Sequence, residues 1–146
     1  MSASGPPIRG RAGRLALAAA TVVYLVLLAS QTLGPQPEAA GGVLSALTAL
    51  MATSSVTAWI TYPVLEFVAN IVLFVPLGVL WVGWAGRRRW WWAAAAGLLV
   101  SAAIEATQGL LLPDRFADVR DLVSNTLGAL LGAAAVAAVT RPRLRR

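Results

Sequence analysis

The sequence contains no cysteine, no histidine and no lysine. Without cysteine there are no disulfides and no thiolate chemistry, and without histidine there is no imidazole base and no zinc site of the cysteine/histidine kind. A metal ion would have to be a hard cation held by carboxylate and amide oxygens. All basic side chains are arginines.

Charge of either sign is also scarce. Only 12% of the 146 residues are charged, and 58% are hydrophobic. Soluble domains carry roughly 25% charged residues. The apolar residues come in long blocks, so the chain is predicted to be an integral membrane protein with one domain. The net charge of +6 would suggest nucleic acid in a soluble domain. Here the arginines cluster beside apolar blocks, so no nucleic-acid partner is expected.

Four apolar segments are long enough to span a membrane, since each approaches the ~20 residues that cross ~30 Å of hydrocarbon. They cover about residues 15–33, 64–84, 90–112 and 122–140. We therefore expect an all-α, multi-pass transmembrane helical bundle. A weaker apolar stretch over residues 43–60 is interrupted by Ser54 and Ser55, and predicts an outer-surface or re-entrant helix between the first two spans.

The arginines predict an orientation. Three clusters precede the first span, separate the second from the third, and follow the fourth. With four spans these clusters share one side, which the positive-inside rule makes cytoplasmic. The expected organisation is a basic cytoplasmic tail over residues 1–14, a transmembrane domain over 15–140 and a second basic cytoplasmic tail over 141–146. A cleaved signal peptide is the alternative for the first span; its long core and poor cleavage site favour a retained helix.

Acids and amides recur at a similar depth in the last three spans. A rise of 1.5 Å per residue places them between the outer edge of the membrane and roughly 10 Å below it. Their spacing of three or four residues puts each pair on one helix face. The pairs are Glu66 and Asn70, Glu105 and Gln108, and Asp121 and Asn125, with Asp118 one turn before Asp121. Polar side chains cost less free energy when they face one another inside the bundle than when they face lipid. The pattern therefore predicts a polar pocket open to the outer side.

Several roles stay open on these residues alone. Asn70, Gln108 and Asn125 are either hydrogen-bonding contacts between helices or ligand-binding groups. Arg115, in the predicted outer loop, either pairs with nearby aspartates or binds an anionic group. Other residues predict helix packing: Pro76 a kink, Gly78 a close approach, and Gly128 with Gly132 a small-residue face.

The stretches EFVANIVLFVPLGVL and IEATQGLLLPDRFADVRDLVSNTLGALLG resemble the signature of the VanZ-like family of small bacterial membrane proteins. That signature has an acid and an asparagine before F-x-P-x-G, then E-x-x-Q, an arginine, D-x-x-D and N-x-x-G-x-x-x-G. The matching positions are Glu66, Asn70, Phe74, Pro76, Gly78, Glu105, Gln108, Arg115, Asp118, Asp121, Asn125, Gly128 and Gly132. The resemblance implies a multi-pass protein of the bacterial plasma membrane, and a link to resistance against the glycopeptide teicoplanin.

The favoured function is an outward-facing pocket that binds a cell-wall precursor, a lipid head group or a glycopeptide among the membrane lipids. The alternative is a hydrolase or transferase that uses Glu105 with Asp121 or Asp118, either as acid and base or with a divalent cation on Glu105 and Asp121. No cofactor is otherwise predicted. A proton-coupled carrier is less favoured, because no carboxylate lies in the inner half of the membrane. The sequence leaves a homo-oligomer open.

Overall fold

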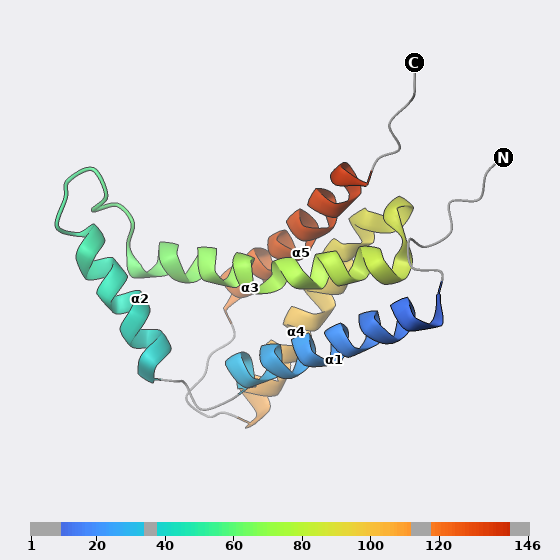
Figure 1. The fold of residues 1–146 in the computed structure, drawn as a ribbon. Helices are drawn as coiled ribbons and strands as arrows, with labels where there is room; N and C mark the ends of the chain where they lie inside the picture. Colours follow the sequence, from blue (N-terminus) through green and yellow to red (C-terminus); the bar gives the residue numbers. More distant parts are fainter. Residues whose placement is uncertain (1–9, 34–37, 112–117, 141–146) are drawn as a thin grey trace, which may run out of the picture.

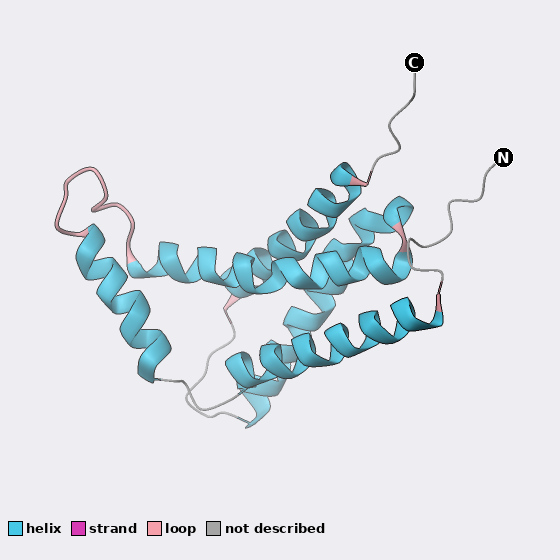
Figure 2. Cartoon of the chain, in the orientation of Figure 1, coloured by secondary structure: helices cyan, strands magenta, loops and turns pink. Residues whose placement is uncertain are grey.

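The fold is known from a computed structural model that describes residues 10–33, 38–111 and 118–140. All regular secondary structure in these residues is helical (Figures 1 and 2). The elements are α1 (Arg11–Leu33), α2 (Glu38–Met51), α3 (Tyr62–Ala85), the 3-10 helix η1 (Arg87–Trp92), α4 (Ala93–Leu111) and α5 (Val119–Val139).

Four of these helical segments are long and apolar enough to cross a membrane, as the sequence predicts. They are α1, α3, η1 with α4, and α5. The third begins differently from the prediction of residue 90, because Arg87–Trp92 form a 3-10 turn before α4 starts at Ala93. The fourth begins at Val119, three residues earlier than predicted, because Asp118 caps its first turn.

The two ends of the bundle differ in character. At one end lie the beginning of α1, the end of α3 with η1, the beginning of α4 and the end of α5 (Figure 1). We call this the arginine end, because Arg11, Arg14 and the Arg87–Arg89 triplet lie there. The opposite end, where α3 and α5 begin and α1 and α4 finish, is the polar end.

The helices α3 and α5 pack with their backbones nearly touching. A Cβ atom on Gly128 would overlap the carbonyl oxygen of Ile71, and one on Gly132 would overlap that of Val75. From the other helix, a Cβ on Gly78 would overlap the carbonyl oxygen of Ala129. This interface needs glycine, since no larger residue fits between the two backbones.

The helix α1 is the least buried of the four spanning segments, and two hydrogen bonds join it to α3. The Tyr24 hydroxyl donates to the Leu73 carbonyl oxygen at 3.2 Å. The Trp84 indole N–H donates to the Thr21 hydroxyl at 3.0 Å. Most of its large apolar side chains are left facing outward, as expected for a lipid-facing helix.

Between α1 and α3 the chain forms the predicted short apolar helix, followed by a loop. The helix α2 ends at Met51, and turns and bends follow over residues 52–59. The Thr57 hydroxyl donates to the Met51 carbonyl oxygen at 2.6 Å and closes this loop. Trp59 on this loop is 68% exposed. Figure 1 shows this loop at the left, beside the beginning of α3 and opposite the arginine end, so the loop belongs to the polar end of the molecule.

Candidate functional site

An amide and a carboxylate link α3 to α5 at the polar end. Asn70 lies two turns into α3, and Asp121 lies in the first turn of α5. The Asn70 Nδ2 donates to Asp121 Oδ1 at 2.7 Å. Both side chains are half-buried. Hydrogen bonds to an ionised acceptor are the stronger kind, so this bond fixes the beginning of α5 against α3.

A second carboxylate binds the beginning of α5 from α4. Glu105 is 7% exposed, and its Oε2 accepts the backbone N–H of Asp118 at 3.1 Å. Asp118 is the N-cap of α5, and its Oδ1 accepts the N–H of Arg120 at 2.8 Å. The two carboxylates therefore satisfy N–H groups that the start of a helix leaves free, where negative charge is also favoured.

One turn deeper, α4 and α5 meet through a buried polar pair. Asn125 is 6% exposed, and its Nδ2 donates to Ser101 Oγ at 2.9 Å, with Ser101 fully buried. The Oδ1 atom of Asn125 is buried and has no hydrogen-bond partner among the described residues. The Thr126 hydroxyl next to it in sequence is in the same situation. Asn125 lies one turn below Asp121, and Ser101 one turn below Glu105.

The helix α1 also makes a contact at the polar end, which the sequence does not reveal. Gln108 on α4 donates through Nε2 to the Thr32 carbonyl oxygen at 2.7 Å, near the end of α1. Its partner is a backbone atom, so the contact does not depend on which side chain α1 carries there and cannot be found from the sequence. Gln108 thus ties α1 to α4 and is not bonded to the residues around Asp121.

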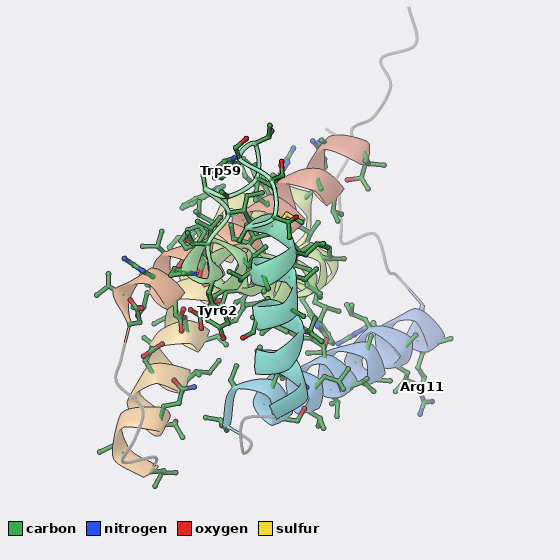
Figure 3. All side chains as sticks on the ribbon, turned by 90° about the vertical axis from the view of Figure 1, so that its left-hand side faces the viewer. Arg11, Trp59 and Tyr62 are labelled. Atoms are coloured by element: carbon green, nitrogen blue, oxygen red, sulfur yellow. The ribbon has the colours of Figure 1, made fainter. Side chains whose placement is uncertain are left out.

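Glu66 is exposed, as is Asp118. Glu66 lies one turn before Asn70 on α3, and its carboxylate interacts electrostatically with Asp121 and Asp118, and with the opposite charge of Arg120. Glu105 likewise interacts with Asp121 and Asp118. We call Glu66, Asn70, Glu105, Asp118, Asp121 and Asn125 the polar cluster. Figure 3 views it from the polar end, with side-chain oxygens gathered near Tyr62, where α3 begins.

Some predicted positions fall elsewhere. Arg115 lies outside the described residues, as do the tails 1–9 and 141–146 with their arginines. The helix α3 continues through Pro76 as one helix. The Pro76 side chain is exposed, whereas Gly78 on the same helix lies against the backbone of α5.

The polar cluster offers oxygen acceptors in place of nucleophiles. Among the residues that the structure describes, no three acidic side chains converge closely enough to hold a metal ion. A two-carboxylate cation site on Glu105 and Asp121 stays a prediction. What the arrangement provides is a set of carboxylate and amide oxygens on three helices, with one buried acceptor beneath them.

The comparison with known families bears on the whole bundle. The sequence model of the VanZ/LLP1 family matches residues 16–140, which include the polar cluster, three of the spanning segments in full and α1 from residue 16 onward. This chain belongs to the VanZ/LLP1 family. Searches of curated proteins and of solved structures found no match.

The VanZ/LLP1 signature residues divide into two groups in this structure. Gly78, Gly128 and Gly132 form the α3–α5 contact, and buried Phe74 lies beside Gly128. The acids and amides form the polar cluster, apart from Gln108. The sequence analysis did not identify Thr32 or Ser101 as partners of these residues. A serine at i, i+4 from a buried glutamate is the signal that could have identified Ser101.

Proposed function

We propose that the polar cluster binds the polar part of an envelope amphiphile at the outer leaflet of the bacterial plasma membrane. The ligand class is a cell-wall precursor, a lipid head group or a glycopeptide, and a role in glycopeptide resistance would follow from such binding. Both termini are cytoplasmic in this proposal, because the arginine end faces the cytoplasm. The polar cluster at the opposite end then opens to the outside.

The observation that carries this proposal is the unpartnered Oδ1 of Asn125. A buried acceptor without a donor costs about 1–3 kcal/mol, which a protein does not keep without compensation. If the cluster only joined helices, its members would satisfy one another, as Asn70 and Asp121 do. Asn125 satisfies Ser101 and leaves an acceptor over. A ligand group, alone or through a bound water, would supply the missing donor.

The exposure of the cluster supports access from one side. Glu66 is exposed at the first turns of α3, whereas Glu105 and Asn125 are buried between the helices. A ligand that enters from this side would therefore first contact the exposed Glu66 carboxylate and then the buried Asn125 amide. Polar groups at membrane depth are more often functional than merely structural.

The test is to identify what co-purifies with the protein. Wild type, Glu105→Gln and the matched control Glu38→Gln would be purified in mild detergent and their bound small molecules compared by mass spectrometry. Glu38 is the first residue of α2 and is not one of the cluster residues, so its substitution removes one carboxylate while the cluster residues are kept. We expect one amphiphile to be retained by wild type and the control and depleted in Glu105→Gln. Identical profiles in all three would contradict the proposal.

The second candidate is a carboxylate-dependent hydrolase or transferase. The observation that favours it is the electrostatic interaction between Glu105 and Asp121, since paired carboxylates can divide acid and base roles. The same experiment separates the two functions. A retained intact ligand supports binding, whereas a cleaved or transferred product that disappears in Glu105→Gln supports catalysis.

A further inference from the structure

We infer that the group recognised by the polar cluster is a primary ammonium on the head of the amphiphile. This inference rests on the proposed function and names the chemistry of its ligand. The charge of the cluster, its available acceptors and the kind of cation that fits them support it.

The first step is the charge. Among the described residues, the cluster and its immediate neighbour bring four carboxylates, Glu66, Glu105, Asp118 and Asp121, against one guanidinium, Arg120. Within the same residues, the charges that act on Glu105 and Asp121 are those of other carboxylates. Crowding like charges in a partly buried site is unfavourable, so a bound cation would stabilise the site and an anionic head group would be repelled.

The second step is the supply of acceptors. Glu105 uses Oε2 for the Asp118 N–H, and Asp121 uses Oδ1 for Asn70. Among the described residues, the second oxygen of each carboxylate therefore stays available to a ligand. The buried Asn125 Oδ1 is a third acceptor and is independent of the acids. The Asn125 amide lies beneath Asp121 on the same face of α5, and its Nδ2 is already engaged by α4. The site therefore calls for a ligand with several N–H donors.

The third step separates the classes of cation. A primary ammonium has three N–H donors, which suit the acceptors that Glu105 offers on α4 and that Asp121 and Asn125 offer on α5. A quaternary ammonium has no N–H to donate and is recognised by aromatic faces instead. The observations thus favour the primary ammonium over the quaternary one.

The experiment uses the full chain in nanodiscs or detergent and compares three phospholipids with identical acyl chains. Native mass spectrometry would measure binding of phosphatidylethanolamine, phosphatidylcholine and phosphatidylglycerol. We expect phosphatidylethanolamine to bind about tenfold more tightly than the other two, as charge-assisted hydrogen bonds would produce. Glu66→Gln and Asn125→Ala should each reduce this preference, whereas Glu38→Gln should keep it.

Glu66→Gln matters because Glu66 is exposed, so its substitution should leave folding intact. Equal binding of the three lipids, or a preference unchanged in both cluster variants, would overturn the inference. If a different amphiphile still co-purifies in a Glu105-dependent manner, the proposed function survives that result. If nothing co-purifies either, both fail.

A competition experiment separates two sources of the same ammonium chemistry. A short peptide with a free side-chain amine, as in a cell-wall precursor, would be compared with its N-acetylated form. Displacement of the bound lipid by the free amine alone supports the inference and indicates a precursor peptide. Retention of the lipid against both peptides, with its preference over phosphatidylcholine intact, supports it for a lipid head group. Equal displacement by both peptides would contradict it.

Discussion

Individual side chains at the polar end combine two tasks that are hard to separate by inspection. The Asn70–Asp121 bond joins α3 to α5, while the same carboxylate belongs to the proposed ligand site. Glu105 similarly supports the first turn of α5 and contributes charge. The contribution of these side chains to the free energy of unfolding can be measured without knowing the ligand, so it is the first quantity to test.

A double-mutant cycle on Asn70→Ala and Asp121→Ala should give a coupling energy of about 0.6–1.7 kcal/mol, the range of interhelical hydrogen bonds in membranes. The measurement is the free energy of unfolding of the four proteins in mixed micelles. Thr107→Ala with Asp121→Ala gives the control cycle, because Thr107 bonds only within its own helix. Additive effects in the Asn70 cycle would show that this bond contributes nothing to stability.

At this scale the sequence predicts which residues share a face but not which atoms meet. The i, i+4 spacing places Asp121 above Asn125, and the depth argument places both near Asn70 and Glu105. Neither argument could find the contact of Gln108 with Thr32, because any residue offers the same backbone carbonyl. Nor could they find that Glu105 bonds to the N–H of Asp118, which depends on where α5 begins.

At the scale of the helices, α3 and α5 form the centre of the molecule. Their contact is built from glycine against backbone, and the buried residues of α5 are small: glycine, alanine, serine and asparagine. Lipid tails are as apolar as leucine, so membrane helices gain stability mainly from close packing and from polar contacts. The sequence predicts this face from Gly128 and Gly132, but the matching carbonyl oxygens on α3 require coordinates.

Gly128→Ala and Gly132→Ala should each destabilise the protein, by about 1–3 kcal/mol, because the new methyl group overlaps backbone that cannot move alone. The measurement is thermal unfolding in detergent. Gly109→Ala on α4 is the matched control, since a Cβ there meets nothing within 4 Å. It should be neutral or stabilising by up to ~1 kcal/mol, because alanine favours helix. Equal effects at Gly109 and Gly128 would refute the close approach of α3 and α5.

For the whole molecule, the separation of the α1 and η1 arginines from the carboxylates of the polar cluster connects the fold to the proposed function. The described arginines of α1 and η1 share one end, and the polar cluster lies at the other (Figure 1). The predicted orientation depends on the number of spans, because a fifth span would place the arginine clusters on different sides of the membrane. The structure has α2 as a short helix outside the set of spanning helices, which keeps that argument consistent.

The orientation can be tested cleanly because the chain has no cysteine of its own. Single cysteines would be introduced at three exposed positions, Ala12→Cys and Thr140→Cys at the arginine end and Ser55→Cys on the loop before α3. All arginines are kept, so the signal that sets orientation is unchanged. We expect a membrane-impermeant maleimide to label only Ser55→Cys in intact cells.

Permeabilised cells should then show labelling at all three positions, and the cysteine-free wild type should show none. Labelling of Ala12→Cys or Thr140→Cys in intact cells would place the arginine end outside. The polar cluster would then face the cytoplasm, where it could not reach a ligand of the outer leaflet. The ammonium chemistry of the cluster would still stand in that case, but its ligand would have to be sought on the inner leaflet.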